Sequence, residues 1–401
     1  MSDTIPKGWK WVKLGEVAEV VGGFAFKSQH FGKHGTPVVK IKDIKPPYID
    51  VEELEKVDTS FYNDKNLKKY YIEKDDFVLA MTGATIGKIG ILKRDLKLLI
   101  NQRVAKIVPK DMINKAFIYY SINNNTFQQF IQNNIDSNSA QENISSQSIG
   151  RFPIPLPPLP EQKAIAEVLS SIDDKIDLLH RQNKTLEEMA MTLFRQWFIE
   201  PTKDGLPEGW GEKKLKDIYF LEKGIEPGSK NYLETPSIDS IRFIRVGDML
   251  DNKANVYIQK DLVGNSICKF DDLLVSFDGT VGRVSFGIQG CYSSGIRKIY
   301  SKDEIYNKLW LKHQIFVSED IQDEINMYAE GTTILHASSS IDYLSFAFPL
   351  KEKIEEYDKF FDPIYKKMLH NKKSIQTLEK LRDTLLPKLM SGEVRAKMEI
   401  M

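Results

Sequence analysis

The sequence has little of what marks several protein classes. Its 401 residues include only two cysteines, Cys268 and Cys291, which are too few for a disulfide framework. No run of about 18 apolar residues occurs, and the first residues lack the apolar core of a signal peptide. Hydrophobic residues make up 41% of the chain, which excludes a disordered protein. These features predict a soluble, cytoplasmic protein of roughly two or three domains, with no membrane segment.

The chain also lacks net charge, because 56 Lys and Arg residues balance 56 Asp and Glu residues. The balance is the sum of four segments that differ in net charge. Residues 1–155 carry 22 basic and 17 acidic side chains, whereas residues 201–349 carry 17 and 22. Residues 156–200 carry 5 and 8, and residues 350–401 carry 12 and 9. Overall neutrality therefore does not exclude a nucleic acid as partner, although phosphate binding depends on Lys and Arg.

Four blocks of sequence occur twice, in the same order in each half of the chain. The opening Pro-Lys-Gly-Trp, for example, returns as Pro-Glu-Gly-Trp with an offset of 201 residues. Shared strand composition could account for one such block but not for four. We therefore interpret the chain as a tandem repeat of one unit of about 200 residues. The blocks begin at Pro6, Val38, Asp75 and Leu186, and they return at Pro207, Phe243, Asp271 and Leu378.

Each half is predicted to be an α+β globular part followed by a long helix. Short runs rich in Val, Ile and aromatic residues, bounded by Gly, Asn and Pro, indicate strands. Residues 115–131 and 307–325 show helical periodicity. The globular parts are placed at residues 1–155 and 201–349. The predicted strands include Thr36–Ile41, Phe77–Met81, Val104–Val108, Ile241–Val246 and Leu273–Phe277.

Residues 156–200 and 350–401 are predicted to be long helices that pair as an antiparallel coiled coil, related by a pseudo-twofold axis. Their apolar residues alternate spacings of four and three, and each seam contains one asparagine. Opposite net charges favour pairing with each other over self-pairing. Pro363 is expected to separate a turn over 351–361 from the second helix. The predicted pairing residues are Ile165, Leu169, Ile172, Ile176, Leu179, Asn183, Leu186 and Leu193 in the first helix, and Ile364, Met368, Asn371, Ile375, Leu378 and Leu385 in the second.

Several short motifs resemble catalytic signatures but lack an essential residue. Gly83–Lys88 has three residues between its glycines where a nucleotide-binding P-loop has four. It is therefore either a plain hairpin or a contact for a DNA phosphate. Lys45-Pro46-Pro47-Tyr48 has lysine where an amino-methyltransferase needs a hydrogen-bond acceptor. The histidines show no ligand spacing, and the repeated Asp75-Asp76 pair fits a turn better than a metal site. The chain is predicted to be non-catalytic.

The order of parts resembles the specificity subunit of type I restriction-modification enzymes. The resemblance rests on the Pro-x-Gly-Trp opening and on three further motifs, at Gly23–Ser28, Gly83–Lys88 and Pro155–Gln162. It implies two target recognition domains separated by the helix pair. Each domain would read one half of a bipartite, asymmetric site in double-stranded DNA, and the helices would set the gap. The second half departs from the pattern, because Leu221–Lys230 lacks the Phe-Ala-Phe-Lys-Ser stretch of the first.

The resemblance also implies partners that carry the chemistry. Two methyltransferase (M) subunits would dock on the helices, and translocating nuclease (R) subunits would cleave DNA. S-adenosylmethionine, ATP and magnesium are expected on those partners and not in this chain. A non-catalytic coiled-coil adaptor that binds other proteins stays open as the alternative, supported by the overall neutrality.

Polar side chains at strand ends are the candidates for DNA contact. Arginine can bond guanine, and asparagine or glutamine can bond adenine, in the major groove. The polar segments 137–148 and 331–340 form a second pair of candidates, and a solvated loop is the alternative for any single residue. The individual candidates are Thr82, Thr85, Lys88, Asn101, Gln102 and Arg103 in the first half, and Asp278, Thr280, Arg283, Ser293, Ser294 and Arg297 in the second.

Overall fold

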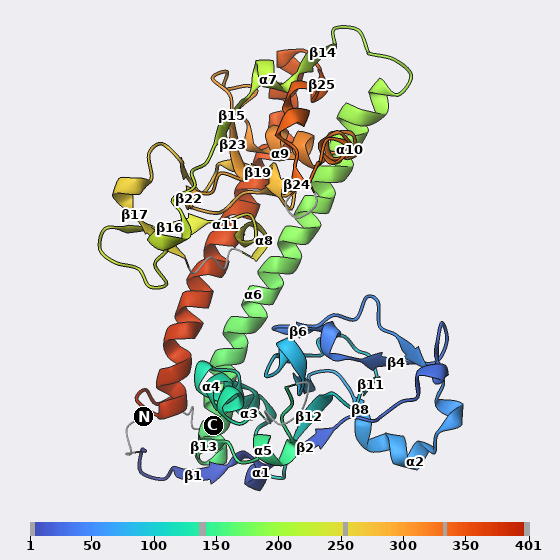
Figure 1. The fold of residues 1–401 in the computed structure, drawn as a ribbon, viewed down its shortest axis with the longest axis vertical. Coiled ribbons are helices and arrows are strands. Elements are labelled where there is room, and N and C mark those ends of the chain that lie inside the picture. The colour runs from blue at the N-terminus through green and yellow to red at the C-terminus, as the bar shows by residue number, and fades with distance from the viewer. Residues whose placement is uncertain (1–4, 136–141, 252–255, 332–334, 397–401) are drawn as a thin grey trace. The chain divides into compact units, whose positions relative to one another are not determined.

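The chain forms two compact units in a computed structural model (Figure 1). Unit 1 comprises residues 1–174 and 379–401, and unit 2 comprises residues 175–378. Each unit contains one globular part and a stretch of both long helices. The structure describes residues 5–135, 142–251, 256–331 and 335–396.

Unit 1 contains two larger sheets and a two-stranded one, β1–β13. One sheet has the strand order β2-β12-β9-β10-β6-β5 and the other β3-β7-β4-β11-β8. The strands are β1 (Lys10–Lys13), β2 (Ala18–Gly22), β3 (Phe31–Gly32), β4 (Thr36–Val39), β5 (Ile44–Lys45), β6 (Tyr48–Ile49), β7 (Lys56–Val57), β8 (Tyr71–Ile72), β9 (Phe77–Ala80), β10 (Ile89–Ile91), β11 (Leu98–Ile100), β12 (Val104–Pro109) and β13 (Pro153–Leu156). The short helices are α1 (Leu14–Val17), α2 (Asp64–Leu67), α3 (Lys115–Ile122), α4 (Asn125–Asn133) and α5 (Ser146–Ile149).

Unit 2 repeats this plan. Its sheets have the orders β15-β23-β19-β21 and β17-β16-β22-β18, with two-stranded pairs β14–β25 and β20–β24. The strands are β14 (Gly211–Lys214), β15 (Phe220–Lys223), β16 (Ser240–Ile244), β17 (Tyr257–Gln259), β18 (Ile267–Cys268), β19 (Leu273–Ser276), β20 (Asp278–Gly279), β21 (Val284–Ser285), β22 (Gly290–Tyr292), β23 (Ile296–Tyr300), β24 (Leu335–His336) and β25 (Ser345–Phe348). The short helices are α7 (Leu215–Ile218), α8 (Asp248–Asp251), α9 (Leu309–Val317) and α10 (Glu319–Met327).

The strand orders confirm the tandem repeat. The order β15-β23-β19-β21 corresponds to β2-β12-β9-β10, and β17-β16-β22-β18 corresponds to β7-β4-β11-β8. The five predicted strands are all present, with ends displaced by at most two residues. Each predicted helical segment forms two helices. In unit 1, the side chain of Asn124 caps α4 by accepting from the Phe127 amide, which ends α3 and starts a new helix.

The two long helices are α6 (Leu159–Phe194), which continues into a π-helical turn, and α11 (Lys351–Ser391). The expectation of a separate turn over 351–361 is wrong, because α11 runs through Pro363 without a break. Ile354, Phe361 and Tyr365 form one buried face on both sides of the proline. Burial of that face outweighs the single backbone hydrogen bond that proline removes.

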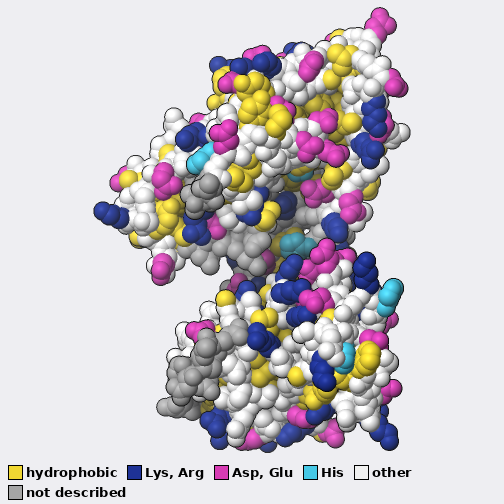
Figure 2. Space-filling view, turned by 45° about the vertical axis from the view of Figure 1, so that its right-hand side comes forward, with side chains coloured by type: hydrophobic (Ala, Val, Ile, Leu, Met, Phe, Trp, Pro, Cys, Tyr) yellow, Lys and Arg dark blue, Asp and Glu magenta, His cyan; other side chains and the backbone are white. Residues whose placement is uncertain are grey.

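The cores of both units take side chains from the long helices. In unit 1, Ile165 and Leu169 of α6 and Leu389 of α11 pack with Phe117 of α3. In unit 2, Phe361 of α11 stacks on Trp310 of α9 with ring centroids 4.4 Å apart. Acidic and basic side chains are interspersed on the face of each unit in Figure 2. Within the described ranges, none of the helices combines the length and apolarity needed to cross a lipid bilayer.

Candidate nucleic-acid interface

Two turns of unit 1 meet at one end of its six-stranded sheet. The first, Thr82–Lys88, joins β9 to β10, and the second, Asn101–Arg103, joins β11 to β12. Ala80 pairs with Val104 across β9 and β12, and the Met81 amide donates to the Arg103 carbonyl at 2.9 Å. We call these two turns together tip surface 1. The structure therefore brings together the six candidate residues of the first half.

The side chains of tip surface 1 differ in their exposure. Lys88, Gln102 and Arg103 are exposed, Thr85 and Asn101 are half-buried, and Thr82 is buried. Among the described residues, no carboxylate lies within ion-pair distance of Lys88 or Arg103. Tip surface 1 thus presents two cations whose charges are not neutralised by a neighbour in the described part of the chain.

The loop Gly83–Lys88 is a hairpin turn. Gly83 and Gly87 have φ of 70° and 83°, a conformation that glycine adopts without strain. The Gln128 side chain donates to the Gly87 carbonyl at 2.7 Å, and a Cβ on Gly87 would come within 2.6 Å of that side chain. The hairpin thus accounts for the glycines, and it leaves the exposed Lys88 at the turn.

Unit 2 builds the same two turns with the same backbone hydrogen bonds. We call Asp278–Arg283 and Ser293–Gly295 together tip surface 2. The Phe277 amide donates to the Gly295 carbonyl at 2.9 Å, as Met81 does to Arg103. The Ile296 amide donates to Ser293 at 2.9 Å, and its counterpart Val104 donates to Asn101 at 2.8 Å. The structure thus confirms the alignment of Asn101–Arg103 with Ser293–Gly295.

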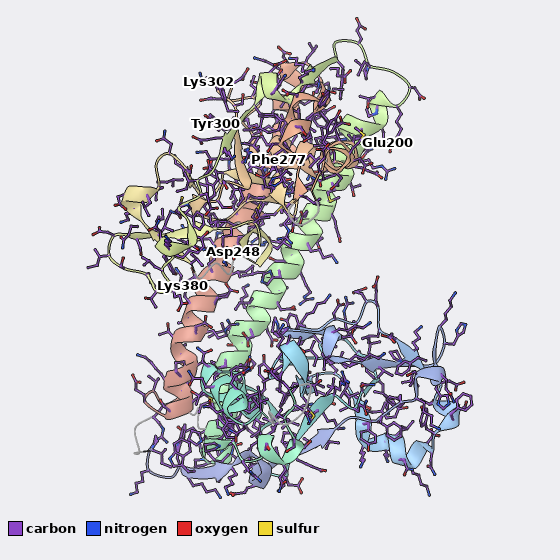
Figure 3. All side chains as sticks on the ribbon, viewed as in Figure 1. Glu200, Asp248, Phe277, Tyr300, Lys302 and Lys380 are labelled. Carbon is purple, nitrogen blue, oxygen red and sulfur yellow. The ribbon has the colours of Figure 1, made fainter. Side chains whose placement is uncertain are left out.

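The predicted polar segments 137–148 and 331–340 reach these turns in both units. Residues 137–141 and 332–334 of those segments lie outside the described residues. In unit 1, the Ile144 amide donates to Met81 at 3.0 Å. In unit 2, the Ala337 amide donates to Phe277 at 2.8 Å, and Figure 3 labels Phe277 within this unit. Two sequence segments that were predicted separately therefore contribute to one surface in each unit.

One glycine, which is not among the predicted contact residues, packs tightly against each tip surface. A Cβ on Gly23 would lie 2.2 Å from the Asn101 carbonyl oxygen, and a Cβ on Gly224 would lie 2.2 Å from that of Ser293. The residues that follow, Phe24 and Ile225, form equivalent bridges to Asn101 and Ser293. The offset of 201 residues between the opening blocks also relates Gly23 to Gly224, so this signal was present in the sequence.

The two arginine candidates of unit 2, Arg283 and Arg297, are bonded within the unit. Arg297 is 5% exposed, and it donates to the Ser294 carbonyl at 2.7 Å and to the Ser338 hydroxyl at 2.9 Å. Burial lowers the pKa of its guanidinium. Arg283 is half-buried and donates to the Val246 carbonyl at 2.9 Å. These two arginines hold loops together and do not project into solvent as Arg103 does.

The remaining candidates of unit 2 include one exposed side chain, Thr280. Ser293 is buried and Ser294 is half-buried. Asp278 lies 2.8 Å from His336, which belongs to the neighbouring strand β24. Tip surface 2 therefore exposes the neutral Thr280, and its one cation, Arg283, is bonded to a backbone carbonyl, whereas the cations of tip surface 1 are exposed.

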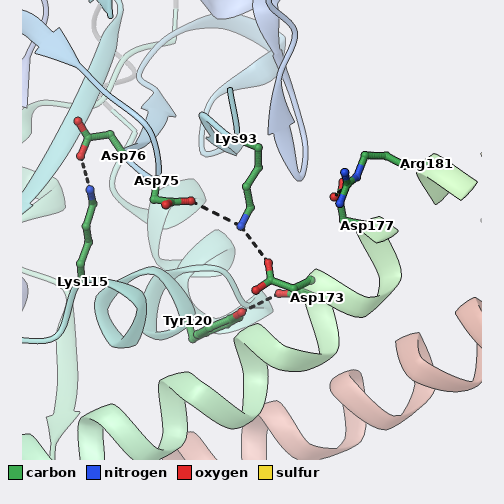
Figure 4. A network of polar contacts seen from close by, with 9 residues as sticks. Asp75, Asp76, Lys93, Lys115, Tyr120, Asp173, Asp177 and Arg181 are labelled. Atoms are coloured by element: carbon green, nitrogen blue, oxygen red, sulfur yellow. Dashed lines mark hydrogen bonds and ion pairs between the residues drawn. The ribbon is translucent and has the colours of Figure 1, made fainter. Parts of the chain in front are cut away.

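The repeated aspartate pair has structural partners in unit 1 (Figure 4). Asp76 pairs with Lys115, and Asp75 lies 3.6 Å from Lys93. Lys93 also pairs with Asp174 of α6 at 3.1 Å, which ties the globular part to the helix. Within the described residues, no group of three or more His, Cys, Asp or Glu side chains could hold a metal ion.

The long helices pack antiparallel within each unit. In unit 2, Asn371 donates to Asn183 at 3.0 Å, so the asparagines of the two seams meet. In unit 1, Arg382 pairs with Asp173 at 3.1 Å, and Asp173 also accepts from the Tyr120 hydroxyl at 2.8 Å. Of the other predicted pairing residues, Ile165, Leu169, Ile172, Ile176, Leu179, Met368 and Ile375 are buried, whereas Leu186, Leu193, Ile364, Leu378 and Leu385 are half-buried.

Glu161 connects two of the motifs that carry the resemblance, the Pro-x-Gly-Trp opening and Pro155–Gln162. Trp9 of the opening motif donates to Glu161 of the Pro155–Gln162 motif at 2.9 Å, and Arg395 pairs with the same carboxylate. The neighbouring Gln162 donates to Pro157 at 2.9 Å and accepts from the Asn114 amide at 2.9 Å. These contacts give a structural reason for both motifs, since a buried carboxylate needs partners.

Comparisons with known proteins agree with this architecture. A family model described as the type I restriction modification DNA specificity domain matches residues 6–188. The chain is 26% identical to the type I restriction enzyme MjaIX specificity subunit of Methanocaldococcus jannaschii over 434 aligned residues, covering 98% of this chain and 95% of that protein. It is 26% identical to the EcoBI specificity subunit of Escherichia coli, covering 70% and 62% of the two chains.

A solved structure shares the fold. The S subunit of a type I restriction-modification system from M. genitalium aligns with a TM-score of 0.57 at 15% sequence identity, and the alignment covers 97% of both chains. The repeated α+β plan, the paired helices and these similarities agree with one another. The first half of the chain thus matches the type I restriction modification DNA specificity domain, and the chain as a whole is similar to type I restriction enzyme specificity subunits.

Proposed function

We propose that this chain is the DNA-recognition subunit of a type I restriction-modification complex, and that each globular part reads one half of a bipartite, asymmetric site in double-stranded DNA. The pair of tip surfaces carries the proposal. Their backbones share hydrogen bonds one by one, whereas their side chains differ. A constant frame with different side chains suits two unlike half-sites, because base contacts specify sequence and the frame fixes position.

The proposal assigns the chemistry to partner subunits. Methyl transfer with S-adenosylmethionine belongs to two M subunits, and ATP-driven translocation and cleavage with magnesium belong to R subunits. The chain itself is then a non-catalytic subunit. It works in the cytoplasm, where its two free, buried cysteines, Cys268 and Cys291, stay reduced.

The paired helices provide docking surfaces for the M subunits and set the gap between the half-sites in this proposal. Two polar contacts of the pair support a fixed register. Asn183 bonds Asn371 in unit 2, and Asp173 pairs with Arg382 in unit 1. A buried polar pair fixes register because any shift leaves its groups without partners.

Selection from random-sequence duplexes tests the proposal. The chain, assembled with its methyltransferase partners, is expected to recover a split consensus with a fixed gap. Recovery of no consensus would contradict DNA reading and would favour the protein-binding adaptor instead. The same selection with a variant that fails to assemble with the partners is the background control.

A matched deletion tests the role of the helices. Residues 175–181 and 373–379 lie between the two polar contacts, so removing both segments retains Asn183–Asn371 and Asp173–Arg382. Seven residues of helix span about 10 Å, or about three base pairs of duplex. The selected gap should shorten by about that amount while both half-sites stay the same. A changed half-site with an unchanged gap would contradict the role of the helices.

A further inference from the structure

An exposed aromatic pair lies beside the five-stranded sheet of unit 1. Phe61 ends the 3-10 turn that follows β7, and its side chain is 63% exposed, the largest value for an aromatic side chain among the described residues. Its ring stacks on His30, with centroids 4.2 Å apart and an interplanar angle of 16°. The pair therefore presents a flat apolar ring to solvent at the edge of this part of unit 1.

A rigid base supports the pair. His30 Nδ1 lies 2.7 Å from the Tyr62 hydroxyl, and that hydroxyl accepts from the Lys27 amide at 3.0 Å. The rings of Phe24 and Phe26 meet Tyr62 edge-on at 5.3 and 5.4 Å. Contacts on several sides therefore fix the orientation of His30, and with it the orientation of Phe61.

The aromatic pair is continuous with tip surface 1. Phe24 forms a β-bridge to Asn101, and Phe24 packs on Tyr62, which contacts His30. A ligand on tip surface 1 that extends over this aromatic chain reaches Phe61. The pair thus lies next to the surface that the proposed function assigns to DNA.

The exposed lysines on the chain segments that flank the pair in sequence are free of ion pairs. Within the described residues, no carboxylate lies within 4.0 Å of their ammonium groups, whereas Lys40 and Lys42 on the same sheet both pair with Glu55. Un-neutralised lysines on the segments that carry an exposed ring fit a polyanion that also carries flat apolar surfaces, which is the chemistry of nucleic acid. The exposed lysines are Lys27, Lys33, Lys65, Lys68 and Lys69.

We propose that Phe61, supported by His30, inserts between two stacked base pairs of duplex DNA beside the half-site read by unit 1, with these lysines on the flanking phosphates. This inference rests on the proposed function. Apolar side chains that wedge into a base step unstack it and bend the duplex, and the added contacts offset the cost of unstacking. Stacking on His30 holds the Phe61 ring in its exposed orientation.

At the corresponding place, the described residues of unit 2 hold no phenylalanine stacked on a histidine. At the position of Phe24 it has Ile225, and its sequence there does not repeat the Phe-Ala-Phe-Lys-Ser stretch. Tyr232 contacts Phe243 in the interior and offers no exposed stacked pair. The unstacked base step is therefore expected on one side of the bipartite site only.

Duplexes with 2-aminopurine at single positions test the inference, because the fluorescence of this base rises when it is unstacked. In the complex with methyltransferase partners, one position beside the half-site of unit 1 should brighten. Phe61→Ala should abolish that signal and weaken DNA binding about tenfold. Phe61→Trp should retain both, since it keeps a flat apolar ring.

Tyr343→Ala is the matched control. Tyr343 is 53% exposed and stacks on Tyr328 at 4.6 Å, but the neighbouring Asp342 pairs with Lys216 at 2.8 Å, so this lysine is neutralised. This variant should leave the signal and the affinity unchanged.

Unchanged 2-aminopurine signal and affinity in Phe61→Ala would overturn the inference. So would a Phe61→Ala variant that assembles poorly with methyltransferase partners yet unstacks DNA normally, since that would make the pair a protein contact. A wild-type complex that selects no split consensus would overturn the proposed function itself, and the selection experiment detects that outcome separately.

Discussion

Tip surface 1 and tip surface 2 share their backbone hydrogen bonds, but their cationic side chains differ in exposure and in bonding. Lys88 and Arg103 of the first are exposed, and no carboxylate pairs with them among the described residues. In unit 2, Arg283 and Arg297 donate to groups of their own unit, and Asp278 lies against His336. Two copies of the same backbone can therefore carry different electrostatics. We expect phosphate contacts to dominate on the first surface and hydrogen bonds on the second.

The largest expected effect tests whether the two surfaces share one frame. Gly23→Ala and Gly224→Ala should each destabilise their unit by about 3–4 kcal/mol, because the new Cβ would lie 2.2 Å from a carbonyl oxygen. Thermal unfolding measures both changes. Gly32→Ala and Gly247→Ala, with no atom within 4 Å of the new Cβ, should change little. A cost in one unit only would show that the frames differ.

The next largest effect is a pH dependence of the stability of unit 2. His313 of unit 2 is buried, and burial lowers its pKa to about 3. The unfolded state binds a proton below about pH 6.5, so the stability of unit 2 should fall by about 2.3 kcal/mol between pH 6.5 and 4.5. Hydrogen exchange resolved by unit measures this loss. His313→Gln should remove the dependence and exposed His336→Gln should not, and equal losses in both variants would contradict this assignment.

A smaller effect is expected from Arg297. Because its hydrogen bonds hold Ser294 and Ser338 together, Arg297→Ala should destabilise unit 2 by about 2 kcal/mol. Urea unfolding gives the value, and exposed Lys230→Ala in the same unit is the control. A stable variant that loses one half-site would instead make Arg297 a base contact.

The smallest effect sharpens the role of tip surface 1. Arg103→Ala should leave stability unchanged and should cost about 1.5 kcal/mol of discrimination at one half-site. Lys88→Ala should weaken binding to all sequences alike and should lower the salt slope by about 1. Binding to the selected and mismatched duplexes at several salt concentrations distinguishes the two. Equal loss at both half-sites in Arg103→Ala would contradict its assignment to one of them.

Much of the fold could be predicted because it repeats. The aligned turns Asn101–Arg103 and Ser293–Gly295 share their hydrogen bonds, as the repeat blocks indicated. The asparagine at each helix seam also indicated a polar contact, and Asn183 does bond Asn371. Periodicity and repetition predict the secondary-structure elements and their order, since spacing along the chain sets which face of an element a side chain occupies.

Side-chain exposure was not predictable from the same patterns. Arg103 and Arg297 were equal candidates in the sequence, but only Arg103 faces solvent. Pro363 indicated a helix boundary, yet the buried face formed by Phe361 and Tyr365 keeps α11 continuous. Both outcomes depend on groups distant in sequence that no local pattern contains.

The sequence by itself determined the tandem α+β plan, the two long helices and the resemblance to specificity subunits. Only the tertiary structure decided which cations are free and which aromatic side chains stay exposed. It also placed the tight contacts at Gly23 and Gly224. The physical reason is that repetition and periodicity are properties of the chain, whereas burial, pairing and steric contact depend on which distant segments fold against each residue.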